Sequence, residues 1–211
     1  MKTLLFVVLM TIPLFGSVSS KTQCDGVSLN IDTKWLTMDL ECKEKMAAQV
    51  QTELNAAMTY LAMGAHFSKD RENRPGFAKF FFESASEERE HAIKIISYLL
   101  MRTNPADYLK GLISEPKPLK TEWTSGVDAL ENALSLETNV TVSIRDIISS
   151  CEGGTNDYHL VDYLSGEFLD EQYKGQRELA GMISTLQKMT DGQGVLGEYL
   201  FDKKLLNNEL F

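Results

Sequence analysis

The chain has 211 residues, 43% of them hydrophobic, and a formal net charge of −9 at neutral pH. This length and this hydrophobic share are sufficient for one domain with a substantial core. The acidic balance argues against nucleic acid or an anionic lipid surface as a partner, because a negative surface repels both. It is compatible with a protein that collects cations.

The first twenty residues have the pattern of a cleaved signal peptide. Lys2 precedes an apolar run at 4–10, and small residues at 16–20 follow Pro13. The run is shorter than the ~20 apolar residues that a membrane span needs, and no second such run follows, so we expect no membrane association after cleavage. We therefore predict a signal peptide at 1–20, an N-terminal arm at 21–38, one domain at 39–211, and secretion.

Three cysteines follow the expected cleavage point: Cys24, Cys42 and Cys151. In an oxidising compartment this odd number leaves at least one thiol without a partner in the same chain. That indicates a disulfide to another subunit or a buried free thiol. Cys24, in the arm before the helices, is the preferred candidate for an intermolecular bond. A bond between Cys24 and Cys42 is the alternative.

Apolar residues recur at helical spacing in four long segments without internal proline, at 40–65, 77–99, 127–148 and 160–186. The first two segments, and the last two, are separated by short connections, which predicts antiparallel neighbours. The breaker-rich stretch at 104–118 is long enough to carry the chain along the length of a bundle. The sequence therefore predicts an all-α, antiparallel four-helix bundle with one long crossover.

Glycines mark two further boundaries in this plan. Gly153 and Gly154 are expected to separate the third long helix from the fourth. Gly192, Gly194 and Gly197 are expected to end the fourth, and the apolar tail at 199–206 then predicts a short fifth helix.

Each apolar face is interrupted by polar side chains near the middle of its helix: Glu53 and Tyr60 in the first, Glu88 and His91 in the second, Glu137 in the third and Gln172 in the fourth. A carboxylate on a core face must be paired or must bind a metal. Glu88 and His91, three residues apart, lie side by side on a helix. The four interruptions lie at one height in an antiparallel bundle, which predicts a single buried cluster.

This cluster has the ligand chemistry of an iron or manganese site. Carboxylates with one imidazole suit those metals, and the thiolates that mark structural zinc are missing from the cluster. Carboxylate bundles that bind two metals carry a Glu on each of two helices and a Glu-x-x-His on each of the others. Here Gln172 and Gly175 replace the second Glu-x-x-His. One metal position should therefore be weaker, which favours a metal that is oxidised and released over a permanent cofactor.

Structural roles are the alternative for single members of the cluster, since a core His or a Glu at the edge of an apolar face can be satisfied by a neighbour. Four coincident interruptions disfavour that interpretation. The other two histidines, His66 and His159, lie at helix ends, where capping or surface roles are ordinary.

The chain resembles the ferritin family, in particular the heavy-chain-type subunit of secreted insect ferritins. The resemblance covers nearly the whole chain after the signal peptide. It rests on these runs: Tyr60-Leu61-Ala62-Met63, Asn73-Arg74-Pro75-Gly76-Phe77, Glu87-Glu88-Arg89-Glu90-His91-Ala92, Ala129-Leu130-Glu131, Leu136-Glu137, Glu171-Gln172 and Tyr199-Leu200-Phe201-Asp202-Lys203. The Glu-Glu-Arg-Glu-His run is highly specific in this setting.

The resemblance implies a role for each residue of a di-iron ferroxidase centre. Glu53, Glu88 and His91 match the ligands of the first iron, with Glu88 bridging. Glu137 matches the main ligand of the second iron, and Glu87 matches a mobile carboxylate that hands iron on.

The same resemblance places Tyr60 and Gln172 beside the metals as supporting residues. It implies that two ferrous ions, which are transient substrate, are oxidised by dioxygen or peroxide. The ferric product would then form a mineral inside a 24-subunit shell. It further implies homologous partner subunits, including a light-chain-type chain linked by disulfides, and iron storage and transport in the secretory pathway.

Acidic residues outside the centre carry weaker expectations. Glu83, Glu87 and Glu90 would form an inner face that nucleates mineral, or would simply be solvated. Ile93 occupies a position that is often acidic in the family, which thins this patch.

The family's three-fold entry channel is only partly matched. Asp162 matches one of its acidic residues, but Ser165 stands where a glutamate is expected. Iron entry by that channel is therefore in doubt unless Asp157 and Glu167 compensate.

The sequence leaves two alternative functions open and contains one candidate modification site. The chain would otherwise be a non-catalytic structural ferritin subunit or a secreted four-helix cytokine-like ligand, although the latter has no reason to place carboxylates at matching heights. Asn139-Val140-Thr141 is a glycosylation sequon. It lies within a long helix and is expected to be unused, because accepted sites favour surface loops.

Overall fold

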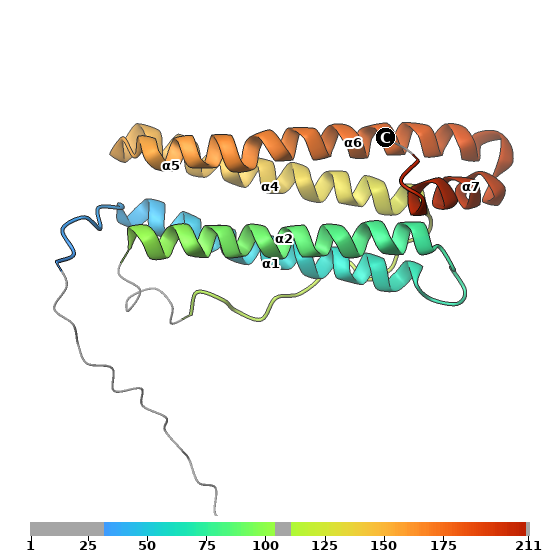
Figure 1. Ribbon diagram of the computed structural model, residues 1–211, viewed down its shortest axis with the longest axis horizontal. Helices are drawn as coiled ribbons and strands as arrows, with labels where there is room; N and C mark the ends of the chain where they lie inside the picture. The colour runs from blue at the N-terminus through green and yellow to red at the C-terminus, as the bar shows by residue number, and fades with distance from the viewer. Residues whose placement is uncertain (1–31, 104–110, 210–211) are drawn as a thin grey trace, which may run out of the picture. The chain divides into compact units, whose positions relative to one another are not determined.

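The computed structural model describes residues 32–103 and 111–209. This part of the chain is helical, without strands, and contains α1 (Leu40–Phe67), α2 (Pro75–Arg102), α4 (Gly126–Thr155), α5 (Tyr158–Tyr163), the π-helical turn η1 (Leu164–Leu169), α6 (Asp170–Gln193) and α7 (Val195–Leu206). Figure 1 shows α1 beside α2, and α4 beside a continuous rod formed by α5, η1 and α6. The expected all-α four-helix bundle with a short fifth helix is confirmed.

Side chains at the helix ends explain where the helices begin. The carboxylate of Asp39 accepts a hydrogen bond from the backbone N–H of Glu41 at 2.9 Å, and the hydroxyl of Ser125 accepts one from the N–H of Asp128 at 3.1 Å. Both satisfy N–H groups that have no partner within the helix. Helix α2 begins at Pro75, which needs no N–H partner.

Of the glycine boundaries expected in the last third of the chain, only that at Gly194 is confirmed. Helix α4 runs through Gly153 and Gly154 and is ended by Asn156, whose φ of 53° is left-handed. Gly192 lies inside α6, and Gly197 lies inside α7. A glycine in a helix costs only about 1 kcal/mol relative to Ala, so a long helix can continue through it. Of the three later glycines, only Gly194 lies between the two helices, with a φ of 54°.

The crossover between α2 and α4 lies along α1. Three α1 side chains spaced four residues apart accept hydrogen bonds from its backbone. The donor and acceptor pairs are Ser114 N–H to Gln51 at 2.9 Å, Lys117 N–H to Asn55 at 3.2 Å, and Leu119 N–H to Thr59 at 3.0 Å. One face of α1 therefore holds the described part of the crossover in place.

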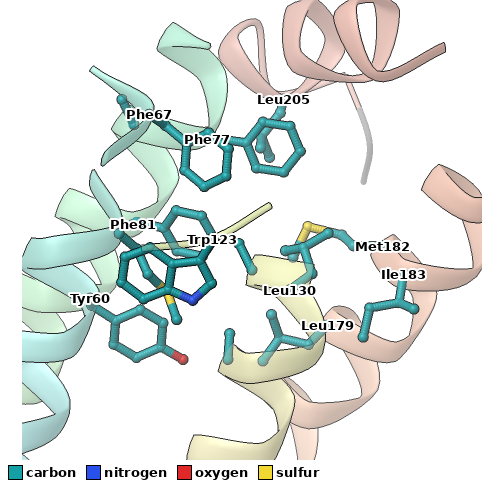
Figure 2. Close-up of a cluster of buried hydrophobic side chains, with 14 of the residues drawn as sticks. Tyr60, Phe67, Phe77, Phe81, Trp123, Leu130, Leu179, Met182, Ile183 and Leu205 are labelled. Atoms are coloured by element: carbon teal, nitrogen blue, oxygen red, sulfur yellow. The ribbon is translucent and has the colours of Figure 1, made fainter. Parts of the chain in front are cut away.

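Two hydrophobic clusters fill the bundle, and a polar layer separates them on every long helix. One cluster contains Tyr60, Phe77 and Phe81 (Figure 2), and the other contains Met46 and Ile95. On α1 the two clusters stop at Ala56 and Val50, on α2 at Ala85 and Ala92, on α4 at Leu136 and Val140, and on the α5–α6 rod at Leu179 and Phe168. The residues left between them include Glu53, Glu88, Glu137 and Gln172, all buried.

Helix α7 ties the ends of the other helices together. The fully buried Asp202 accepts hydrogen bonds from the N–H groups of Gly76 and Phe77 at 2.8 and 3.0 Å, at the start of α2. Glu198 accepts from the N–H of Gly126 at 3.0 Å and pairs with Arg74 at 3.0 Å. A carboxylate at a helix N-terminus is favourable because of the helix dipole, so these contacts fix α7 against α2 and α4.

A disulfide joins Cys42, near the start of α1, to Cys151, near the end of α4, with 5.8 Å between the Cα atoms. The alternative bond between Cys24 and Cys42 is therefore wrong. Cys24 and the predicted signal peptide lie outside the described residues, so the intermolecular bond through Cys24 stays a prediction. No helix within the described residues is both long and apolar enough to span a membrane.

Replacing both Cys42 and Cys151 with Ser is expected to lower the free energy of unfolding by about 2–5 kcal/mol, because the bond restricts the unfolded chain. Guanidinium unfolding under non-reducing conditions measures this difference. Cys24→Ser is the matched control and should leave the intrachain stability unchanged. An equal loss in the control would contradict the assignment.

Candidate metal centre

Glu53 of α1 and Glu88 and His91 of α2 form the only buried group of potential metal ligands in the described part of the chain. One ligand atom from each lies within 4.8 Å of the others. The exposed fractions of the three residues are 0%, 4% and 6%. His91 Nδ1 lies 3.4 Å from Glu88 Oε2, as expected for residues one turn apart.

One carboxylate oxygen of Glu53 accepts a hydrogen bond, and the other has no hydrogen-bond partner. Gln49, one turn earlier and fully buried, donates from Nε2 to Glu53 Oε1 at 2.8 Å. The hydroxyl of Ser143 on α4 donates to Gln49 Oε1 at 2.5 Å and fixes that amide. Glu53 Oε2 is buried without a hydrogen-bond partner. An orphaned carboxylate oxygen beside a second carboxylate and an imidazole fits a bound cation.

Glu137 of α4 has a different environment, because both of its oxygens accept hydrogen bonds. The hydroxyl of Tyr60 donates to Oε1, and Gln172 Nε2 donates to Oε2 at 2.9 Å. The Gln172 carbonyl in turn accepts from the hydroxyl of Thr141 at 2.9 Å. Gln172 therefore presents its N–H group to Glu137, while its carbonyl oxygen is already engaged.

The negative charges of these carboxylates repel one another. Burial, and then the nearby charge of Glu88, raises the pKa of Glu53 well above 4.5. Burial, and then the charge of Glu137, raises the pKa of Glu88 well above 4.5. Burial, followed by the charge of Glu137, also raises the pKa of Tyr60. Without a cation the layer holds protons, and a divalent ion would replace them.

An acidic opening lies next to the buried group. A cavity of about 500 Å³ is lined by carboxylates that include Glu87, Glu167, Asp170 and Glu171. Glu171 Oε2 lies 3.3 Å from His91 Nε2, and its side chain is 52% exposed. Partial burial, and then the charge of Glu171, raises the pKa of Glu87. These residues give cations a negatively charged approach to His91.

Glu171 and Gln49 belong to the site but do not interrupt an apolar face in the way that Glu53 or Glu88 does, so they were not predicted as site residues. Glu171 follows the exposed face of α6, and only its position next to Gln172 in the sequence points to the site. Gln49 lies four residues before Glu53, a spacing that predicts contact on a helix. Because a glutamine can serve many core roles, that spacing alone is a weak signal.

The π-helical turn η1 explains how the rod formed by α5, η1 and α6 brings its side chains to the site. Leu160, Leu164, Phe168 and Gln172 are spaced by four residues and are all buried. On a regular α-helix each four-residue step drifts by about 40°. The wider π turn offsets this drift, and such turns are frequent at functional sites. It places Gln172 against Glu137 and the ring of Phe168 5.6 Å from His91.

The remaining predicted residues lie outside the buried group. Glu83, Glu90 and Asp162 are exposed. Asp157 is paired with Arg102 at 2.9 Å, with a side chain only 9% exposed, and it caps α5, so it is poorly placed to replace a channel glutamate. Asn139 is exposed on α4.

Neither of the other histidines joins the cluster. His66 is buried and lies edge-on to Phe67 and Trp123, rather than on the surface. His159 is exposed, and its Nδ1 lies 2.7 Å from the hydroxyl of Tyr98.

Comparison with known proteins gives a consistent result. The model of the family described as "Ferritin-like domain" matches residues 43–189. The ferritin heavy chain of Papilio xuthus is 55% identical over the full length of both chains, and that of Drosophila melanogaster is 51% identical over 87% of this chain and 90% of its own. The crystal structure of Trichoplusia ni secreted ferritin superposes with a TM-score of 0.84 at 54% identity, covering 88% of this chain and 98% of its own.

The raised carboxyl pKa values predict how stability changes with pH when metal is removed. A raised folded-state pKa gives a contribution to stability that is complete below the unfolded value and is lost as pH rises through the folded value. With a chelator present, the free energy of unfolding should therefore fall as pH rises above about 4.5, the ordinary carboxyl value, toward the raised folded-state values.

Glu53→Gln should flatten this decline and stabilise the metal-free protein at pH 7 by roughly 1–3 kcal/mol, the cost of an unsatisfied buried polar group. Chemical denaturation across the pH series measures it. Glu83→Gln, which changes an exposed carboxylate on α2, should behave like the unmodified chain. Parallel curves for Glu53→Gln and the unmodified chain would contradict the assignment.

Proposed function

Because the chain belongs to the ferritin family, we propose that it is an iron-storage subunit that oxidises Fe(II) to Fe(III) at a buried di-iron centre and deposits the product as mineral. The observation that carries this proposal is the group formed by Glu53, Glu88 and His91, with its unpartnered carboxylate oxygen. Iron is the substrate of this site. Family membership sets aside the cytokine-like alternative.

The two halves of the centre would hold iron unequally. Glu53, Glu88 and His91 would bind the first ion, for which Glu53 Oε2 is free. Glu88 would bridge to the second ion, held mainly by Glu137. That second ion must compete with the hydrogen bonds from Tyr60 and Gln172 to Glu137. This competition supports a transit site, from which the second ion leaves easily.

Glutamates of the site would exchange their protons for iron when iron binds. Glu53 and Glu88 hold protons when no cation is present, and iron binding releases them. Two ferrous ions then give up one electron each, with dioxygen as the acceptor. The phenol of Tyr60 and the amide of Gln172 keep Glu137 oriented by donating to its two oxygens.

Carboxylates around the opening would move iron between the centre and its surroundings. Glu171 touches His91 from the rim, and Glu87 lies next to it. Both are exposed enough to change rotamer, so they are suited to receive ferric iron. Glu83 and Glu90, exposed on the same side of α2, extend the acidic surface and would nucleate mineral.

The relatives support a proposal for the assembly and the location of this chain. A shell of 24 ferritin subunits, with a light-chain-type partner linked through Cys24, would store and transport iron in the secretory pathway. The likeness to a secreted ferritin supports this location. The signal-peptide pattern at 1–20 and the Cys42–Cys151 bond agree with an oxidising compartment. Mass measurement under reducing and non-reducing conditions tests the assembly.

Replacing Glu88 or His91 with Ala should lower the initial rate of aerobic Fe(II) oxidation by roughly 100-fold or more, because each removes a direct ligand where even supporting partners are worth 10–100-fold. Absorbance of the ferric product in the assembled protein gives the rate. Glu90→Ala, between the two ligands on α2 but exposed, is the matched control. Full activity in Glu88→Ala, with particle mass unchanged, would overturn the proposal.

The double variant Glu83→Gln/Glu90→Gln separates oxidation from mineral growth. The initial oxidation of two ferrous ions per subunit should be unchanged, because neither residue contacts the centre. Mineral growth at high iron loading should slow several-fold, because the nucleating charges are gone. Light scattering and iron content per particle measure growth. Unchanged growth would mean that these carboxylates are only solvated.

A further inference from the structure

A chain of aromatic rings leads from the metal centre to the protein surface. The ring of Phe168 lies 5.6 Å from His91, and Tyr163 lies 5.7 Å from Phe168. Tyr163 stacks on Tyr98 with 4.3 Å between ring centres, and Tyr98 stacks on the exposed His159 at 5.7 Å. No two successive rings in the series are more than 5.7 Å apart between their centres. The rings therefore provide a short path for an electron between the buried ligand His91 and Tyr98.

The hydroxyl of Tyr98 has its hydrogen bonds arranged for proton transfer. Arg102 Nη1 donates to this oxygen at 2.7 Å, and a guanidinium can only donate. With that side of the oxygen occupied, the phenol proton can pass to His159 Nδ1, also at 2.7 Å, when this nitrogen carries no proton. Asp157 fixes the guanidinium with contacts of 2.9 and 3.2 Å. Because His159 is exposed, a proton that it accepts can pass to water.

The surroundings of Tyr98 favour coupled loss of an electron and a proton. Its side chain is buried, at 4% exposure, and burial raises its pKa to about 12. The phenol therefore keeps its proton at neutral pH until an electron leaves. Loss of the electron alone would leave a buried phenol cation beside Arg102, which is unfavourable. The nearby imidazole removes that obstacle by taking the proton.

We propose that Tyr98 is an electron donor to the di-iron centre, connected to it through Tyr163 and Phe168, with His159 as its proton acceptor. This inference rests on the proposed ferroxidase function. The oxidant is hydrogen peroxide, the two-electron product of dioxygen at the centre. The electron from Tyr98 is needed when only the firmer iron position is filled, because a single ferrous ion supplies one electron and the reduction of peroxide requires two.

The O–O bond of peroxide breaks, and two electrons and two protons from solvent convert its halves into two water molecules. One electron comes from the ferrous ion, which becomes ferric, and the other comes from Tyr98. The Tyr98 proton moves to His159 Nδ1, leaving a neutral phenoxyl radical. A later ferrous ion returns an electron, His159 returns the proton, and Tyr98 is restored. Peroxide is thereby consumed without free hydroxyl radical.

Freeze-quenched electron paramagnetic resonance tests this on the assembled protein, mixed anaerobically with one ferrous ion per subunit and then with equimolar peroxide. The unmodified protein should give a tyrosyl radical signal. Tyr98→Phe should reduce that signal several-fold and should raise hydroxyl radical, measured by a spin trap. Tyr199→Phe, which changes an exposed phenol on α7, should match the unmodified protein.

Two further variants distinguish electron relay from a packing role. Phe168→Leu interrupts the rings without removing Tyr98 and should also reduce the radical signal. His159→Ala, at an exposed position, should reduce it at neutral pH, and added imidazole should restore it. A radical signal that persists in Tyr98→Phe, or no signal in an unmodified protein that oxidises iron, would overturn the relay alone. An unmodified protein that fails to oxidise iron aerobically would overturn the relay and the ferroxidase proposal together.

Discussion

Three carboxylates are buried together in the middle of the bundle. Burying them costs free energy, and hydrophobic packing elsewhere in the fold offsets that cost. Glu53, Glu88 and Glu137 come from three helices and repel one another. Removing an ionised carboxylate from water costs several kcal/mol even in a relaxed protein. Two hydrophobic clusters, one on each side, supply burial that holds the polar layer together. The Cys42–Cys151 bond joins α1 to α4 within one of these clusters.

The way in which each carboxylate is satisfied sets its affinity for a cation. Glu53 has one anchored oxygen and one without a partner, so a metal gains a ligand without breaking a hydrogen bond. Glu137 has both oxygens engaged, so a metal there must displace donors. The inequality of the two positions was inferred from the missing second Glu-x-x-His. The hydrogen bond from Tyr60 to Glu137 supports the same inference independently, and that from Gln172 shows how the replaced residue acts.

Helical periodicity encodes burial, which is why the four long helices and the residues of the polar layer could be predicted from the sequence. A carboxylate that interrupts an apolar face is visible without any structure. Glu171 could not be found in this way, because it reaches His91 from an exposed face. The pairing of Cys42 with Cys151 depends on how α1 meets α4. Gly153 and Gly154 suggested a break, but α4 continues through them to Thr155, because each glycine costs a helix only about 1 kcal/mol.

The π-helical turn connects the unequal metal positions with the aromatic path. Its register places Gln172 against Glu137, which would weaken the proposed second position, and it places Phe168 beside His91, which begins the ring series. A centre that holds one iron firmly and the second weakly is often half filled. A half-filled centre supplies one electron to an oxidant that takes two, so it needs a donor within reach. In the proposed mechanism, the same six-residue turn, Leu164–Leu169, creates that need and places Phe168 on the electron route from Tyr98.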